Sequence, residues 1–182
     1  MLNNFFLAAG ESNVDVVNEW DEEESKDSRA ITLYDVMNTL SPDEFEALCS
    51  LIYRKKGYRT FLTVKSGDKG VDVVVEKDNK YTLIQCKMLS TKNNMPRSAL
   101  DEVYSGSNVY AAHLNIDIEK KAVISTAESI SKDTKEFGTI NGVEIILKNE
   151  IAQLLEEVDI YYSEIYLENG KRYSLEKLKL EV

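Results

Sequence analysis

Three polar side chains interrupt two apolar segments near the middle of the chain, and their types suit metal-dependent chemistry. Asp72 opens the segment VDVVVE after the glycine-containing stretch SGDKG, and Gln85 and Lys87 lie in YTLIQCK. Gln85 and Lys87 are two residues apart, so in a strand they point to the same face. If the two segments pair as a hairpin, Asp72 lies opposite the end of the second strand. A carboxylate, an amide and an ammonium group would then meet at one sheet edge, where they could bind a divalent metal ion and a phosphodiester.

The segments around this hairpin predict an α/β protein with a mixed β-sheet flanked by helices. Consecutive strands are expected to pair antiparallel, whereas strands separated by helices favour parallel pairing. The expected elements are, in order, a helix at 42–56, strands at 58–64, 71–76 and 81–87, a helix at 98–113, a strand at 121–126, a helix at 131–137, a strand at 143–147 and a helix at 149–157.

The first of these helices carries a candidate site residue. Ser41 has the position of an N-cap, Pro42 is at the first helical position, and Glu44 completes a capping box. Glu46 lies next to the apolar stripe of this helix, so its carboxylate could reach inward toward the three polar residues. An exposed helix acid fits the pattern of Glu46 equally well.

The composition restricts the class of protein. A chain of 182 residues that is 43% hydrophobic suits one domain with extensions. No apolar run approaches the roughly 20 residues of a membrane-spanning helix, and the N-terminus lacks the basic leader of a signal peptide, so we expect a cytoplasmic protein that does not bind membranes. Cys49 and Cys86 form no disulfide framework. With His113 as the single histidine, a zinc site and a Ser-His-Asp triad are both disfavoured.

The negative charge is concentrated at the N-terminus. The net charge is −10, and residues 1–40 hold nine acidic and two basic side chains, which account for −7 of it. Residues 41–157 are close to neutral, so the overall charge argues only weakly against nucleic acid as a partner. We expect residues 1–39 to form an acidic, partly flexible arm. This arm is either a solvated linker or a segment, anchored by Trp20, that contacts a partner or covers a DNA-binding cleft.

The middle of the sequence closely resembles a known family. The segment SPDEFEALCSLIYRKKGYRTFLTVKSGDKGVDVVVEKDNKYTLIQCK resembles the Mrr-like (type IV) restriction endonuclease domain of the PD-(D/E)xK nuclease superfamily, in its QxK variant. The likeness rests on the proline and EFE of the first helix, GY before the first strand, SGDxGVD and IQCK. It covers about residues 40–157 and implies a nuclease domain of restriction-endonuclease-like fold. Residues 158–182 remain as a C-terminal extension, in which Asn169-Gly170 predicts a β-hairpin for packing or dimerisation.

The resemblance also implies roles for particular residues. Asp72 corresponds to the main metal-binding carboxylate, Gln85 takes the place of the more usual second acid, and Lys87 corresponds to the catalytic lysine. Glu46 corresponds to the helix acid that approaches the metal, and the backbone carbonyl of Cys86 completes the expected ligand set. The implied cofactor is Mg²⁺, for which Mn²⁺ could substitute.

The implied activity is that of a Mg²⁺-dependent endodeoxyribonuclease acting on double-stranded DNA in a restriction system that defends against foreign or viral DNA. One such site cuts one strand, so a homodimer or a larger homo-oligomer is expected, and a partner protein could supply target recognition. Two alternatives stay open: a Holliday-junction resolvase or repair nuclease, and a DNA-binding or assembly module that does not cut. The expected DNA-binding residues near the site are Lys65, Ser66, Lys69 and Lys92.

Overall fold

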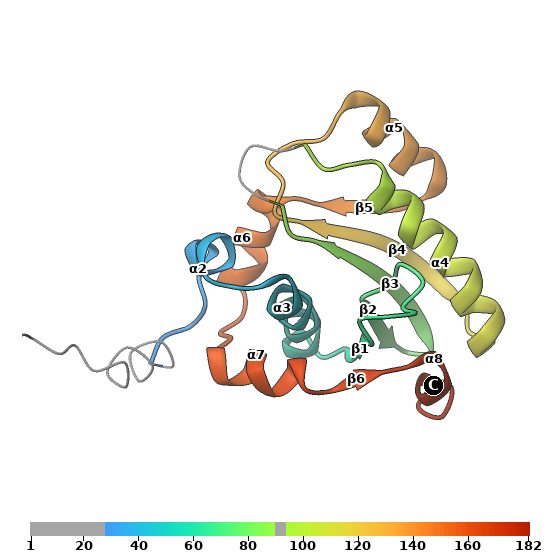
Figure 1. The fold of residues 1–182 in the computed structure, drawn as a ribbon, viewed down its shortest axis with the longest axis horizontal. Helices are drawn as coiled ribbons and strands as arrows, with labels where there is room; N and C mark the ends of the chain where they lie inside the picture. Colours follow the sequence, from blue (N-terminus) through green and yellow to red (C-terminus); the bar gives the residue numbers. More distant parts are fainter. Residues whose placement is uncertain (1–27, 90–93) are drawn as a thin grey trace, which may run out of the picture.

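The structure is a computed structural model that describes residues 28–89 and 94–182 (Figure 1). It contains a six-stranded sheet with helices on both faces, which confirms the expected mixed sheet flanked by helices. The helices are α2 (Leu33–Asn38), α3 (Pro42–Lys55), α4 (Ser98–Leu114), α5 (Lys132–Asn141), α6 (Lys148–Glu156), α7 (Tyr162–Asn169) and α8 (Leu175–Leu178). The strands are β1 (Arg59–Thr63), β2 (Val73–Lys77), β3 (Lys80–Lys87), β4 (Ile118–Ser125), β5 (Val143–Ile146) and β6 (Arg172–Tyr173).

The strand order is β5-β4-β3-β2-β1-β6. Strands β1, β2 and β3 follow one another along the chain and pair antiparallel, whereas β3, β4 and β5 are separated by helices and pair parallel. This arrangement follows from connection length, because a short turn suffices for an antiparallel pair but a parallel pair needs a crossover. The turn between β2 and β3 is made by Asp78 and Asn79, both with positive φ.

The sheet separates two hydrophobic layers. In β2, Val73 and Val75 face a core built with α2, α3 and α6, while Val74 between them faces the core built with α4 and α8. This alternation follows from the two-residue period of a strand, and it explains why the first three residues of β2 are all valine. Figure 1 shows α4 and α5 on one side of the sheet and α3 and α7 on the other.

Helix α3 begins as its sequence predicts. The Ser41 hydroxyl accepts a hydrogen bond from the backbone N–H of Glu44, and the Glu44 carboxylate accepts one from the backbone N–H of Ser41 at 2.7 Å. The helix is followed by Gly57 with a φ of 85°, a left-handed conformation that glycine adopts without a Cβ penalty. Both ends of the helix that carries Glu46 are therefore determined locally.

The C-terminal extension differs from the expected hairpin, and that prediction is wrong. Residues 162–169 form helix α7, and Gly170 has a φ of −73° and a ψ of −11°, so Asn169-Gly170 makes no hairpin turn. Ile165 and Glu168 of α7 are buried, with Ile165 in the core that α3 lines. The tertiary contacts of α7 override the local turn signal. The chain then pairs β6 parallel to β1, so the extension adds the sixth strand.

The N-terminal segment joins the core within its described part. Ile31, Val36 and Leu40 are buried, and the backbone N–H of Ile31 donates to the carbonyl of Ile160 at 2.7 Å. Trp20 and the acidic run around it lie outside the described residues. In the part of the chain that the structure describes, no helix is both long and apolar enough to span a membrane.

Candidate active site

A cleft of about 550 Å³ lies where the start of β2 and the end of β3 meet α3 and α4. Its lining combines acidic, amide and ammonium side chains with the backbone of β3. The lining residues are Pro42, Glu46, Asp68, Gly70, Asp72, Gln85, Cys86, Lys87, Met88 and Glu102. The structure thus brings together the four side chains that the sequence singled out, from helix α3, strand β3 and the loop before β2.

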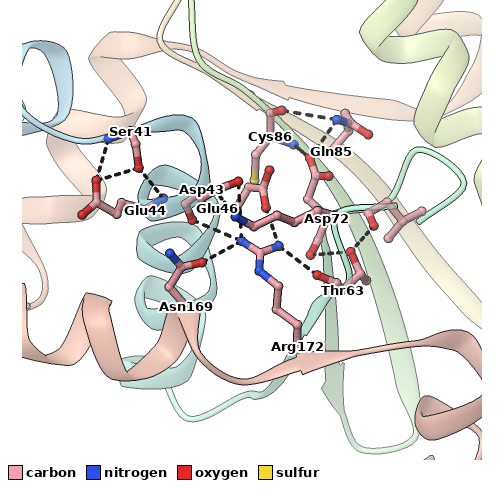
Figure 2. Close-up of polar contacts among 12 residues, drawn as sticks. Ser41, Asp43, Glu44, Glu46, Thr63, Asp72, Gln85, Cys86, Asn169 and Arg172 are labelled. Atoms are coloured by element: carbon pink, nitrogen blue, oxygen red, sulfur yellow. Dashed lines mark hydrogen bonds and ion pairs between the residues drawn. The ribbon is translucent and has the colours of Figure 1, made fainter. Parts of the chain in front are cut away.

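Asp72 lies at the inner wall of this cleft and is 5% exposed. Its Oδ2 accepts hydrogen bonds from the backbone N–H of Cys86 at 2.6 Å and from the Gln85 side-chain amide at 2.7 Å (Figure 2). Burial raises the pKa of Asp72 to about 7, the Glu46 carboxylate adds to this rise, and the hydrogen bond from Cys86 opposes it. Among the described residues, no Lys or Arg side chain forms an ion pair with Asp72.

Gln85 connects Asp72 to the backbone of β3. Its Nε2 donates to Asp72 Oδ2 and to the carbonyl oxygen of Cys86 at 3.3 Å. Its Oε1 is buried and has no hydrogen-bond partner among the described residues. A buried amide oxygen without a donor is costly, so this oxygen is suited to a ligand or a bound cation.

Glu46 turns inward, which decides between the two interpretations that the sequence left open. It lines the cleft, and its Oε2 accepts a hydrogen bond from Arg172 Nη1 at 2.8 Å (Figure 2). Burial raises the pKa of Glu46, and the Arg172 guanidinium opposes that rise. Arg172 was not predicted from the sequence, because it lies 126 positions from Glu46 in a segment expected to form a hairpin.

Lys87 lies at the opposite side of the cleft from α3, at the end of β3. Its Nζ contacts Glu102 Oε2 of α4 at 3.3 Å. Glu102 is a second residue of the cleft that the sequence did not reveal, because it comes close to Lys87 only when α4 packs on the sheet. The contact orients the Lys87 ammonium toward the cleft that both side chains line.

The loop before β2 is held against α4 by close backbone packing. A Cβ on Gly70 would lie 2.7 Å from the carbonyl oxygen of Glu102, and one on Gly106 would lie 2.3 Å from the carbonyl oxygen of Lys69. Asp68 Oδ1 accepts a hydrogen bond from the backbone N–H of Gly70 at 3.0 Å. The two glycines thus allow the loop to approach α4 and place Asp68 at the cleft.

Three of the four residues expected to contact DNA lie on one loop, and the fourth lies outside the described residues. Lys65, Ser66 and Lys69 are exposed on the loop that leads to β2. Lys65 forms an ion pair with Asp43 of α3. Lys92 belongs to the short segment that is not described.

The donor set of the cleft fits a hard divalent cation such as Mg²⁺. Asp72 supplies a buried carboxylate, Cys86 a carbonyl oxygen and Glu46 a second carboxylate. Gln85 would add its amide oxygen after a half-turn of the amide group, because its Nε2 is the atom that faces Asp72 and Cys86. In residues 28–89 and 94–182, no three acidic, histidine or cysteine side chains form a metal-binding cluster by themselves. The fit therefore depends on neutral oxygen ligands and retained waters, which Mg²⁺ accepts readily.

The mixed six-stranded sheet flanked by helices matches the fold of restriction endonucleases. A restriction endonuclease family model, Mrr_cat, matches residues 37–155. The chain belongs to this restriction endonuclease family. No match was found among curated proteins.

Solved structures with the same fold include two restriction endonucleases. The MspJI restriction endonuclease in complex with an oligonucleotide has a TM-score of 0.50 and 16% identity over 97% of this chain and 43% of its own. The modification-dependent restriction endonuclease AspBHI has a TM-score of 0.52 and 16% identity over 100% of this chain and 45% of its own. A protein of unknown function, AF1548, has a TM-score of 0.55 and 16% identity over 64% of this chain and 66% of its own. This chain therefore spans less than half the length of the two restriction endonucleases.

Proposed function

We propose that the chain is a Mg²⁺-dependent endodeoxyribonuclease that hydrolyses phosphodiester bonds of double-stranded DNA in defence against foreign DNA. The observation that carries the proposal is Asp72, a buried carboxylate that has amide donors but no ion pair among the described residues. Burying a carboxylate without a cation is unfavourable, so such an acid marks a place where a cation belongs. The restriction endonuclease family and the presence of Lys87 in the same cleft support phosphodiester hydrolysis as the chemistry.

The proposal assigns a role in this reaction to six of the residues that line the cleft. A Mg²⁺ ion, when bound, lowers the pKa of water and neutralises charge on the phosphoryl group. Asp72, Gln85 and the Cys86 carbonyl would hold that ion, with Glu46 completing its shell or holding one of its waters. Lys87 would stabilise the negative charge that develops on the phosphoryl oxygens, or polarise the attacking water. Glu102 would keep the Lys87 ammonium oriented toward the cleft.

The proposal extends to the substrate and the assembly. Lys69 and Ser66, exposed on the loop before β2, would contact backbone phosphates, together with Lys65 and Lys92. One cleft of this kind acts on one strand, so we expect a homodimer or a larger homo-oligomer on duplex DNA. Target recognition would come from a partner protein or from the segments outside the family match. The free thiols of Cys49 and Cys86 agree with a cytoplasmic location.

Plasmid cleavage with a matched pair of lysine variants tests the proposal. Supercoiled plasmid is incubated with the protein and Mg²⁺ or Mn²⁺, and nicked and linear products are measured against time. Lys87→Ala is expected to lower the rate about a hundredfold or more, because it removes the charge opposite the scissile phosphate. Lys80→Ala, at the exposed other end of β3, is the control and is expected to match the wild type.

The outcomes separate the proposal from its alternatives. Equal nicking by the wild type and Lys87→Ala would contradict the catalytic assignment. Duplex binding without cleavage under either metal would favour a non-cutting module. Cleavage of four-way junctions in preference to linear duplex would favour a resolvase.

A further inference from the structure

Arg172 reaches the cleft from a part of the chain outside the family match. It lies in β6 of the C-terminal extension, whereas the family model ends at residue 155. Its side chain is 11% exposed and lies beneath Glu46 (Figure 2). No other described arginine or lysine forms an ion pair with Glu46.

The Arg172 guanidinium is fixed by several acceptors at once. Nη1 donates to Glu46 Oε2 at 2.8 Å and to the carbonyl oxygen of Thr63 at 2.9 Å. Nη2 donates to Asn169 Oδ1 at 2.8 Å. These acceptors belong to α3, β1 and α7, so the planar fork is held in one orientation and in turn holds one oxygen of Glu46.

Glu46 needs such a partner because of its surroundings. The carboxylates of Asp43, Asp68 and Asp72 repel it, and its side chain is mostly withdrawn from water. Without a cation beneath it, a helix acid in this position would be expected to turn toward solvent. Arg172 offsets the repulsion from one side of Glu46 and leaves its other side available to the cleft.

We propose that Arg172 is a positioning residue of the active site, which holds the Glu46 carboxylate in place for the metal-binding cleft. This inference rests on the proposed function, since it concerns the metal site of the same reaction. It assigns a site role to the C-terminal extension, which otherwise packs on α3 and adds a strand. The nuclease domain alone would lack this contact.

A double-mutant cycle on the full chain tests the role. Mn²⁺ affinity is measured by titration calorimetry, and plasmid cleavage is measured separately, for the wild type, Arg172→Gln, Glu46→Gln and the double variant. Arg172→Gln is expected to lower Mn²⁺ affinity about 10- to 100-fold, as loss of a residue that orients a metal ligand does. The double variant is expected to be no weaker than Glu46→Gln, because Arg172 acts through Glu46.

A control separates this role from general packing. Lys55 of α3 pairs with Glu164 of α7 at 2.6 Å, so it joins the same two helices outside the cleft. Lys55→Gln is expected to keep Mn²⁺ affinity within about twofold of the wild type, since surface pairs contribute little. If Arg172→Gln does not fold, Arg172→Lys replaces it, with an expected loss of at least about threefold because the fork is gone.

Three results would overturn the inference. Wild-type Mn²⁺ affinity in Arg172→Gln, or in Arg172→Lys where that variant replaces it, would remove the role of Arg172 while leaving the nuclease assignment intact. Full additivity of the Arg172 and Glu46 effects would show that they act independently. A wild-type protein that neither binds Mn²⁺ nor cleaves DNA would overturn the proposed function and this inference together.

Discussion

Two regions of the molecule bury carboxylates in opposite ways. Near α2 and α7, Asp35 and Glu168 are each 2% exposed, and each is paired with an arginine. Arg29 holds the pKa of Asp35 well below its usual range. In the cleft, Asp72 is 5% exposed, and its donors among the described residues are two amide groups. Its pKa is raised to about 7, chiefly by burial.

The difference separates acids whose charge is paired inside the fold from an acid that, under the proposed function, pairs with a metal ion. Glu168 accepts from Ser50 Oγ at 2.6 Å and from Arg54, so its charge is satisfied inside the protein. Asp72 is held by hydrogen bonds of 2.6 and 2.7 Å, but no ion pair within residues 28–89 and 94–182 neutralises its charge. A buried acid of the second kind is unfavourable until a cation binds.

The largest expected effect on stability comes from removing an arginine of the paired region. Arg54→Ala leaves Glu168 buried with its charge unmatched, so we expect the free energy of unfolding to fall by about 2 to 4 kcal/mol. Urea denaturation monitored by circular dichroism measures this change. Lys80→Ala, which removes an exposed pair with Glu119, serves as the comparison and should change stability by less than about 0.5 kcal/mol. A loss for Arg54→Ala as small as that of Lys80→Ala would mean that pairing does not stabilise Glu168.

The second effect has the opposite sign and concerns Asp72. In EDTA, Asp72→Asn is expected to raise the free energy of unfolding by about 1 to 3 kcal/mol above pH 7, because it removes an uncompensated buried charge. Thermal melts with EDTA and with Mn²⁺ measure it. Added Mn²⁺ should stabilise the wild type and leave Asp72→Asn unchanged.

The pH dependence of this gain follows from the direction of the pKa shift. The folded protein holds the Asp72 proton up to about pH 7, whereas the unfolded chain releases it near pH 4. The cost of the charge is therefore absent below about pH 4, grows between pH 4 and 7, and is complete above pH 7. A gain for Asp72→Asn that is equal at pH 5 and pH 8 would show that burial of the charge is not its cause.

The smallest expected effect on stability comes from breaking the ion pair between Arg29 and Asp35. Arg29 is half-exposed, so Arg29→Ala should lower the melting temperature only slightly, and less at high salt. Because the folded pKa of Asp35 is depressed, its stabilising contribution is present above about pH 4 and is lost as the pH falls further. Melting temperatures of the wild type and Arg29→Ala at pH 3 and pH 7 check this. A difference that widens toward pH 3 would contradict the pairing argument.

Local patterns in the sequence predicted most of the elements in the family-like region. The capping residues Ser41 and Glu44 fixed the start of α3, and the strand period placed Gln85 and Lys87 on one face. The same local reasoning failed at Asn169-Gly170, where a hairpin was expected. There the burial of Ile165 in the core and the contact of Glu168 with Ser50, 118 positions away, favour a helix.

By itself, the sequence determined the polar trio of Asp72, Gln85 and Lys87, the strands that present it and the family to which it belongs. These features depend on neighbours within a few residues or on a compact motif. Only the tertiary structure decided that Glu46 turns inward onto Arg172 and that Lys87 meets Glu102. Such contacts form when distant elements pack, so no local spacing encodes them, and they complete a site whose central residues the sequence already displays.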